Sequence, residues 1–180
     1  IKAHILCSPH NPLGRIYTKE ELLRIVALAK KYEVLVISDE IHAPLTWVPF
    51  TPYLTLGAAA ERTGVVITSS SKAWNVAGLK AAFLLTQGSE VQARLKGLPE
   101  AMHWRTSLIG AFAMESAFLH SVDWLDDAVE QERFDIEVTE SLLMDDTQAS
   151  MRPPLSKAAS SKQRAAEHAA GKWLNSGSRF

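Results

Sequence analysis

A lysine follows three consecutive serines at the end of a β-branched segment, and this arrangement could support covalent chemistry on a carbonyl group. Residues 65–68 are typical of a buried strand, and Ser69, Ser70, Ser71 and Lys72 come directly after it. A lysine amine held at a strand end is a nucleophile toward carbonyls when its charged form is disfavoured. Serine hydroxyls can donate hydrogen bonds to phosphate. The pattern therefore favours pyridoxal phosphate bound as a Schiff base, although most lysines are solvated surface cations.

Three residues that follow other apolar segments could assist such a cofactor. Asp39 ends an apolar segment, where a carboxylate is costly unless it has a partner, and a protonated pyridine nitrogen would be one. Asn11 could donate its amide to the ring oxygen, and His42 could tune that oxygen or shuttle a proton. Each residue also has a structural interpretation: a cap or surface carboxylate for Asp39, an Asx turn for Asn11 and a loop histidine for His42.

Two other kinds of site are compatible with these residues. His10, Asp39 and His42 could form a metal site, but they lack the close spacing on one element that metal-binding motifs have. Ser69 and Lys72 match the Ser-x-x-Lys pattern of serine nucleophiles, but the companion Ser-Asp-Asn and Lys-Thr-Gly signals are absent from the sequence. Both alternatives are weaker than the pyridoxal phosphate interpretation.

The elements that must position these residues can be recognised from local patterns. Residues 3–7 are expected to form a first strand. Thr18 and Glu21 have the spacing of a capping box, which predicts a helix that runs to about Tyr32. Residues 34–38 are apolar throughout, as in a parallel sheet that is covered on both faces. The remaining expected elements are a loop at 44–56, a helix at 58–63, strands at 65–68 and 81–86, and helices at 89–97, 106–119 and 122–143.

This order of elements predicts an α/β fold with a mostly parallel sheet and flanking helices. In such sheets, ligands bind at the carboxyl ends of the strands. The loops that leave three of the expected strands carry Asn11, Asp39 and the segment 69–72. We therefore expect Asn11, Asp39, Ser69 and Lys72 to lie at the same end of the sheet.

The composition argues against several classes of protein. The chain has 180 residues and is 47% hydrophobic, which is enough for one domain with a sizeable core. A formal net charge of −1 gives no support for binding to nucleic acid or to an anionic membrane. The single cysteine, Cys7, excludes an internal disulfide and fits a reducing compartment. The sequence has no apolar segment of transmembrane length and no signal peptide, and it opens at Ile1 within a strand pattern, which favours a segment of a longer protein.

The charge pattern changes near residue 150. Residues 1–150 carry 13 Lys and Arg against 19 Asp and Glu, whereas residues 151–180 carry six Lys and Arg against one Glu. The second segment has no strand pattern and few large apolar side chains, although residues 160–174 could form an isolated helix. We therefore expect a partial cofactor-binding domain over residues 1–150 and a poorly ordered basic tail over residues 151–180.

Three stretches of the sequence together carry a family resemblance: SPHNPLGRIYTKEEL at 8–22, VISDEIHAPL at 36–45 and TSSSKAWNVAGLK at 68–80. The chain resembles the fold-type I pyridoxal-phosphate enzymes of the class I and II aminotransferase branch over about residues 1–145. Within this branch it is most similar to the cystathionine β-lyase-like subgroup, the C–S lyases of the MalY and PatB kind. The resemblance implies the large domain of the pyridoxal-phosphate-dependent transferase fold, present here in part.

The resemblance also implies a role for each matching residue at the cofactor ring. Lys72 would form the Schiff base with pyridoxal 5'-phosphate and later act as the proton-transfer base. Asp39 would pair with the pyridine nitrogen, and Asn11 would contact the ring oxygen. His42 stands where many relatives carry a tyrosine directed to the same oxygen. The Asp-Glu-Ile-His sequence around it is similar to the lyase subgroup, which favours a lyase over an aminotransferase.

At the cofactor phosphate, the resemblance implies contacts from Ser69 and Ser71. Lys80 stands where many aminotransferases place a phosphate-binding arginine. The family's N-terminal part would supply a second phosphate-binding loop and an aromatic ring stacked on the cofactor, and its C-terminal domain would supply an arginine for the substrate carboxylate. Neither part has a counterpart in this sequence, and residues 151–180 resemble nothing in the family.

The function implied by this resemblance is a pyridoxal-phosphate-dependent carbon–sulfur β-lyase, which acts on an L-amino acid of the cystathionine or cysteine-conjugate type. The resemblance further implies a cytoplasmic enzyme that forms a homodimer and binds neither nucleic acid nor membrane. An aminotransferase that uses the same residues is the first alternative. A non-catalytic remnant or binding protein that keeps the fold is the second.

Overall fold

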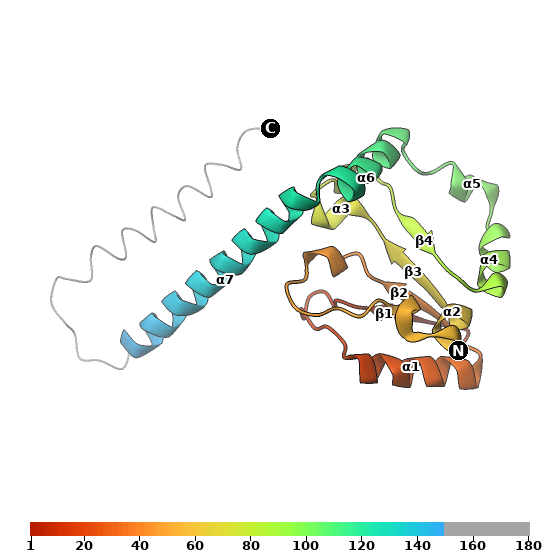
Figure 1. The fold of residues 1–180 in the computed structure, drawn as a ribbon, viewed down its shortest axis with the longest axis horizontal. Helices are drawn as coiled ribbons and strands as arrows, with labels where there is room; N and C mark the ends of the chain where they lie inside the picture. The colour runs from red at the N-terminus through yellow and green to blue at the C-terminus, as the bar shows by residue number, and fades with distance from the viewer. Residues whose placement is uncertain (150–180) are drawn as a thin grey trace. The chain divides into compact units, whose positions relative to one another are not determined.

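The computed structural model describes residues 1–149, and internal contacts divide the chain into two units, Ile1–Arg133 and Phe134–Phe180. The first unit contains a four-stranded sheet with the spatial order β1-β2-β3-β4 (Figure 1). The strands are β1 (Ala3–Cys7), β2 (Leu35–Asp39), β3 (Gly64–Thr68) and β4 (Phe83–Leu85). The first three strands are parallel to one another and β4 is antiparallel to β3, which confirms the predicted α/β fold with a mostly parallel sheet.

Helix α1 (Lys19–Tyr32) begins and ends as the sequence predicts. The Thr18 side chain accepts from the Glu21 N–H, and the Glu21 carboxylate accepts from the Thr18 N–H, so both halves of the capping box are formed. At the other end, Glu33 adopts a left-handed conformation and its N–H donates to the Ala29 carbonyl. These caps fix the length of the helix that joins β1 to β2.

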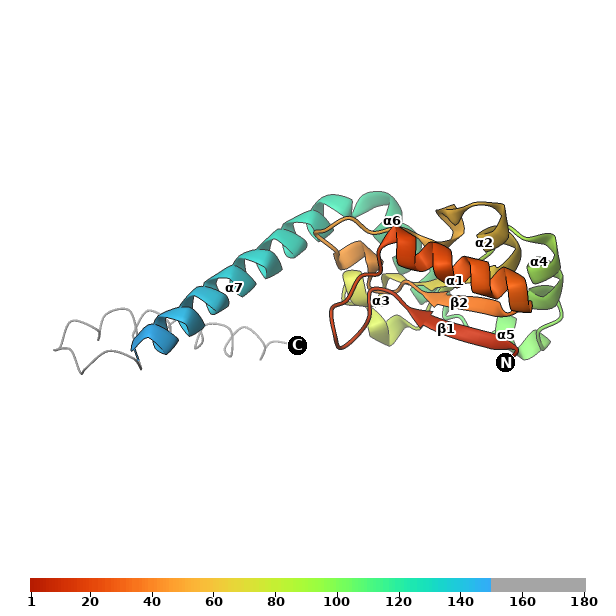
Figure 2. The same cartoon turned by 90° about the horizontal axis from the view of Figure 1, so that it is seen from below.

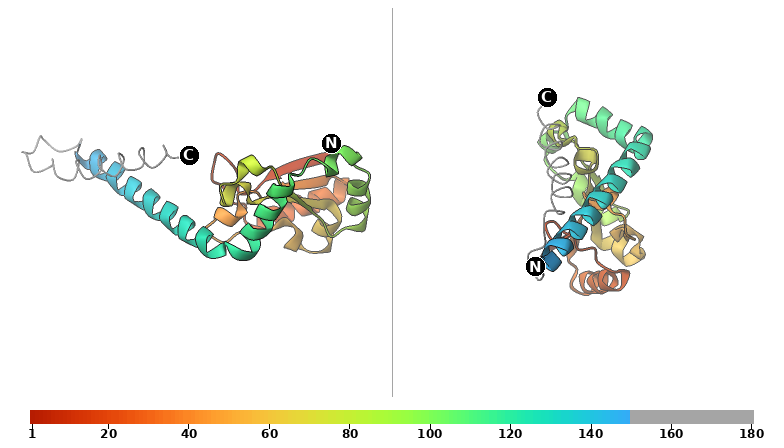
Figure 3. Two further views of the ribbon diagram at one scale, coloured as in Figure 1. Left: turned by 90° about the horizontal axis from the view of Figure 1, so that it is seen from above. Right: turned by 90° about the vertical axis from the view of Figure 1, so that its left-hand side faces the viewer.

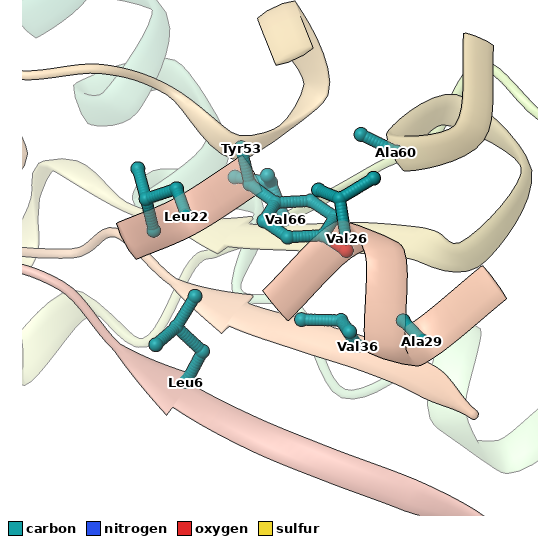
Figure 4. Close-up of a cluster of buried hydrophobic side chains, with 8 residues drawn as sticks. All are labelled: Leu6, Leu22, Val26, Ala29, Val36, Tyr53, Ala60 and Val66. Carbon is teal, nitrogen blue, oxygen red and sulfur yellow. The ribbon is translucent and has the colours of Figure 1, made fainter. Parts of the chain in front are cut away.

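One face of the sheet carries the main hydrophobic core. Helix α1 lies along β1 and β2 on this face (Figure 2), and the 3₁₀ turn η2 (Tyr53–Leu56) and helix α2 (Ala58–Thr63) contact α1. Because side chains alternate along a strand, each of β1, β2 and β3 can turn every second residue toward this face. The buried cluster that results is drawn in Figure 4: Leu6, Leu22, Val26, Ala29, Val36, Tyr53, Ala60 and Val66.

The opposite face of the sheet is open at β1. Ile5 is 72% exposed, and its neighbour in register, Ile37 on β2, is only half-buried, whereas Val65 on β3 is buried. The expectation of coverage on both faces was made for residues 34–38, and among the described residues the β2 side chains on this second face are half-buried. Helix α6 (Leu108–His120), which follows β4 in the chain, contacts α3 (Ser70–Ala73) and the 3₁₀ turn η3 (Ala77–Leu79).

The helices after β3 agree with the sequence in part. Helices α4 (Ser89–Lys96), α6 and α7 (Val122–Ala149) lie close to their predicted positions. Short elements were not predicted: α3 (Ser70–Ala73), α5 (Glu100–His103) and the 3₁₀ turns η1 (Ala43–Leu45), η2 and η3 (Ala77–Leu79). Figure 3 shows α7 as one continuous helix, coloured teal to blue. From Phe134 onward this helix is the described part of the second unit.

Two further observations bear on the sequence predictions. None of the helices within residues 1–149 is both long and apolar enough to cross a membrane. The basic segment 151–180 lies outside the described residues. The expectation that it is a poorly ordered tail therefore stays a prediction.

Candidate functional site

The carboxyl ends of the three parallel strands lie side by side. Cys7 at the end of β1 is in register with Asp39 at the end of β2, and Asp39 is in register with Ile67 of β3. Main-chain hydrogen bonds continue past these pairs, from the Ser8 N–H to the Asp39 carbonyl (3.0 Å) and from the Glu40 N–H to the Ile67 carbonyl (2.9 Å). The segments that carry Asn11, Asp39 and Ser69–Lys72 therefore leave the sheet at one end, as predicted.

Asp39 is held at the end of β2 through one of its two carboxylate oxygens. Its Oδ1 accepts from the Ile41 N–H at 3.2 Å, which closes an Asx turn at the end of β2. The side chain is half-buried, and its second oxygen has no hydrogen-bond partner among the described residues. Such an oxygen suits a cationic N–H, for example that of a pyridinium ring.

The neighbouring carboxylate, Glu40, is the more deeply buried of the two, and sequence reasoning did not single it out. Only 6% of its surface is exposed. Its Oε1 accepts from the Ser38 hydroxyl at 3.0 Å and from the Tyr53 N–H at 2.9 Å. Burial raises the pKa of Glu40, against the effect of these two hydrogen bonds, and the charge of Asp39 raises it further. Glu40 therefore ties the end of β2 to the η2 turn.

The serines after β3 have different roles. Ser69 is buried, and its hydroxyl accepts from the Ser71 N–H at 3.0 Å and donates to the Ala81 carbonyl at 2.6 Å. Because its single proton is used in that bond, the Ser69 hydroxyl is not free to donate to a phosphate. Ser71 is half-buried, and Lys72 and Lys80 are exposed. Ser71 and the two lysines are thus the accessible groups of this segment.

A small hydrophobic cluster holds the backbone beside Lys72. Ala73 and Trp74, the two residues that follow it, are buried against α6 and the first turns of α7. The Trp74 Nε1 donates to the Ser121 carbonyl at 2.9 Å, and its ring meets that of Phe118 edge-on, with 4.8 Å between the centroids. Asn75 then adopts a left-handed conformation. Trp74 was not predicted as an anchor, although an aromatic residue two positions after the lysine is a signal for one.

Asn11 lies at the tip of a closed turn. The His10 N–H donates to the Arg15 carbonyl at 2.8 Å, and the Gly14 N–H donates to the His10 carbonyl at 2.7 Å. The Arg15 guanidinium forms a 2.6 Å ion pair with Glu21, the capping residue of α1. The backbone N–H of Thr18 and this guanidinium hold the pKa of Glu21 below its ordinary value. These contacts fix the position of the Asn11 backbone relative to α1.

A cavity of about 490 Å³ joins this turn to the loop after β2. Asn11 and His42, both predicted to contact the cofactor ring oxygen, line it together. The other lining residues are Pro9, His10, Pro12, Gly14, Ile16, Leu45, Thr46, Trp47 and Val48. A larger cavity of about 590 Å³ lies between α1 and the first two strands and contains none of the predicted site residues.

The residues at this end of the sheet fit pyridoxal phosphate by their chemistry. Asp39 offers a carboxylate oxygen, Asn11 and His42 share a cavity, and Lys72 offers an exposed amine. Two polar atoms on the β1 side, the Ser8 hydroxyl and the His10 Nδ1, are buried without a partner among the described residues. Within the same residues, no group of three or more His, Cys, Asp or Glu side chains is arranged to hold a metal ion.

Comparison with known proteins gives consistent matches. Residues 1–143 match the family model described as aminotransferase class I and II. A relative from Mycobacterium tuberculosis, provisionally named cystathionine beta-lyase, is 43% identical over 126 residues, covering 69% of this chain and 30% of the relative. The cystathionine beta-lyase of Corynebacterium glutamicum is 34% identical over 128 residues, covering 70% of this chain and 34% of that protein.

A solved structure supports the same fold. The PLP-bound C-S lyase from Staphylococcus hominis superposes with a TM-score of 0.67 and 26% sequence identity, covering 79% of this chain and 36% of that one. The chain thus spans about a third of the length of the relatives that it matches.

Proposed function

Because this chain belongs to the aminotransferase class I and II family, we propose that it forms the pyridoxal-phosphate site of a carbon–sulfur β-lyase. The observation that carries the proposal is the register of β1, β2 and β3, whose carboxyl ends bring the segments of Asn11, Asp39 and Lys72 to one end of the sheet. The names of the Corynebacterium glutamicum and Staphylococcus hominis proteins support a lyase in particular.

Each residue around the cofactor ring would have a different role. Bound pyridoxal phosphate would withdraw electrons from the substrate's α-carbon and so weaken its bond to hydrogen. The Lys72 amine would bind the cofactor aldehyde and then accept the α-proton. Asp39, through its free oxygen, would keep the ring nitrogen protonated. Asn11 and His42 would contact the ring oxygen from the cavity that they line.

The phosphate contacts differ from the simple sequence expectation. Ser71 and Lys80 are accessible and would contact the phosphate. Ser69 would act indirectly, since its hydroxyl holds the turn by bonding to Ser71 and Ala81. A change of Ser69 would therefore alter the position of Ser71 as well as any direct contact.

The overall reaction is a β-elimination from an L-cysteine conjugate. The bond between the β-carbon and sulfur breaks, the sulfur leaves with the electron pair and takes a proton to become a thiol, and water releases the remainder as pyruvate and ammonia. An aminotransferase that uses the same residues is the second candidate, because the family model that matches the chain is named for that activity. It would instead pass the amino group to a 2-oxo acid.

Three further features complete the proposal: the class of substrate, the compartment and the oligomeric state. The substrate is an L-amino acid, as the family and its named lyases suggest. Residence in the cytoplasm agrees with the single free cysteine, Cys7. Assembly as a homodimer is proposed from the resemblance to the family.

The test uses the full natural chain that carries this sequence, with Lys72→Ala beside Lys96→Ala, which changes an exposed lysine of α4. The natural protein should show the visible absorbance of lysine-bound pyridoxal phosphate and should release pyruvate and thiol from cystathionine or another cysteine conjugate. Lys72→Ala should lose both properties and Lys96→Ala should keep both. Transfer of the amino group to a 2-oxo acid without pyruvate release would select the aminotransferase. Unchanged absorbance and turnover in Lys72→Ala would overturn the site.

A further inference from the structure

Glu40 is a buried carboxylate that the proposed chemistry does not use. Only 6% of its surface is exposed, and it directly follows Asp39, the proposed partner of the cofactor's ring nitrogen. A carboxylate is costly to bury unless other groups bond to it, so its hydrogen bonds show what it holds in place. Those bonds reach in two directions, from the side chain to η2 and from the main chain to β3.

The side chains of Glu40 and Asp39 are directed to different sides of the strand. Neighbouring residues of an extended strand alternate in direction, so Glu40 shares its side with Ser38 and not with Asp39. The hydrogen bonds agree with this. The Glu40 Oε1 accepts from the Ser38 hydroxyl at 3.0 Å and from the N–H of Tyr53, a member of the main hydrophobic core, at 2.9 Å. Glu40 is therefore placed to act through Asp39 rather than by contact with a ligand of Asp39.

The main chain of Glu40 is held at both of its polar groups. Its N–H donates to the Ile67 carbonyl of β3 at 2.9 Å, and its carbonyl accepts from the Ala43 N–H at 2.9 Å. The second bond closes the turn in which His42 lies, so the same residue fixes the end of β2 and the start of the His42 segment. Strand β3, the η2 turn and this turn are thus all bonded to one residue.

We propose that Glu40 is a positioning residue of the cofactor site: its carboxylate, bonded to the Tyr53 N–H, fixes the direction of the neighbouring Asp39 carboxylate. The inference rests on the proposed function for the role of Asp39. The Asp39 Oδ1 accepts from the Ile41 N–H at 3.2 Å, at the long end of the usual range, so this bond alone orients the carboxylate weakly. A binding group has to be held within about 0.5 Å of its productive position, and the bonds of Glu40 supply that restraint.

Two substitutions separate the reach of the Glu40 side chain from its charge. Glu40→Gln keeps an oxygen at the same distance from the main chain and removes the charge. Glu40→Asp keeps the charge but is one methylene shorter, so it cannot accept from the Tyr53 N–H unless the main chain moves. If Glu40 acts by position, glutamine should replace it and aspartate should not.

The first measurement is the dissociation constant of pyridoxal phosphate, from titration of the apoprotein of the full natural chain followed by visible absorbance. Glu40→Asp should raise this constant about tenfold, the lower end of the range for groups that orient a ligand-binding side chain, and Glu40→Gln should change it little. In an Asp39→Asn background the effect of Glu40→Asp should largely disappear, because the group through which it acts is gone. Val91→Ala is the matched control, since it removes a buried side chain of α4 that takes part in none of these hydrogen bonds.

The second measurement needs no cofactor and separates this inference from the proposed function. Hydrogen exchange of the Ile41 N–H, followed by NMR of isoleucine-labelled protein, reports whether Asp39 keeps its position. Glu40→Asp should speed this exchange about tenfold, whereas Glu40→Gln and Val91→Ala should leave it near the natural rate.

The outcomes distinguish the two ideas. If the natural protein does not bind pyridoxal phosphate, the proposed function fails, and the exchange of the Ile41 N–H alone decides whether Glu40 holds Asp39. If the natural protein binds the cofactor but Glu40→Asp changes neither the dissociation constant nor the exchange, Glu40 is not a positioning residue. Effects of equal size in Val91→Ala would overturn the inference as well, because they would show that any loss of stability has the same result.

Discussion

Replacement of Glu40 tests whether a buried carboxylate organises the end of β2. Glu40→Ala would leave the Ser38 hydroxyl and the Tyr53 N–H without their acceptor. Because a buried donor without a partner costs about 1–3 kcal/mol, the two together should lower the free energy of unfolding by about 2–6 kcal/mol. Glu40→Gln keeps an oxygen that can accept both bonds, so at low pH it should differ little from the natural chain.

The two variants should also differ in pH dependence. The folded-state pKa of Glu40 is raised above its ordinary value of 4.5, mainly by burial, so the folded protein holds this proton more tightly than the unfolded chain does. The contribution of Glu40 to stability is therefore fully present below about pH 4.5 and is lost as the pH rises through the folded-state pKa. Glu40→Gln lacks this titration, so its stability relative to the natural chain should increase from pH 4.5 toward neutral pH.

Urea unfolding followed by far-UV circular dichroism, repeated across this pH range, measures both effects. Glu115, which is exposed on α6, gives the matched control through Glu115→Ala and Glu115→Gln. The reasoning is refuted if Glu40→Ala is as stable as Glu115→Ala. It is equally refuted if the difference between Glu40→Gln and the natural chain stays constant or changes in the opposite direction with pH.

Three further predictions concern the segment around Lys72. Gly110→Ala should lower the Tm markedly, because a Cβ atom there would overlap the Leu79 carbonyl. A Cβ atom at Gly78 meets no atom within 4 Å, so Gly78→Ala should not lower the Tm through a steric clash. Equal Tm values for the two variants would contradict this. Trp74→Phe should lower the free energy of unfolding by about 1 kcal/mol through loss of the bond to the Ser121 carbonyl, and unchanged urea unfolding would argue against that bond. Ser71→Ala should weaken pyridoxal phosphate binding without loss of stability, whereas Ser69→Ala should lower the free energy of unfolding by about 0.5–2 kcal/mol, because the cap of α3 is lost. Cofactor titration and urea unfolding test these roles. A loss of stability in Ser71→Ala, with none in Ser69→Ala, would contradict them.

The fold was predictable from the sequence wherever local signals decide it. The Thr18 and Glu21 pair specifies the start of α1, and short apolar segments specify the parallel strands. Helix α3 was missed because its four residues are too few to show helical periodicity. The antiparallel direction of β4 was not predictable either. The connection from Thr68 to Phe83 is long enough for β4 to run either parallel or antiparallel to β3.

Much of the candidate site was predictable because strand order determines it. Once three parallel strands are recognised, their carboxyl ends bring the segments of Asn11, Asp39 and Lys72 together. The burial of Glu40 was not predictable, because its acceptor role depends on Tyr53, which lies 13 residues further along the chain. Ser69 shows the same limit: its type suggested a phosphate donor, but a carbonyl 12 residues away receives its proton.

The position of β1 at the margin of the sheet has a consequence for its amide hydrogens. The Lys2 carbonyl accepts from Leu35 and the Ser8 N–H donates to Asp39, so the even-numbered residues between them direct their peptide groups to β2. The N–H groups of Ala3, Ile5 and Cys7 point the other way, and among the described residues no strand pairs with that side. Their deuterium uptake should therefore be fast while that of His4 and Leu6 is slow. This alternating pattern of deuterium uptake would disappear if another strand paired with the outer side of β1, because the N–H groups of Ala3, Ile5 and Cys7 would then be hydrogen-bonded.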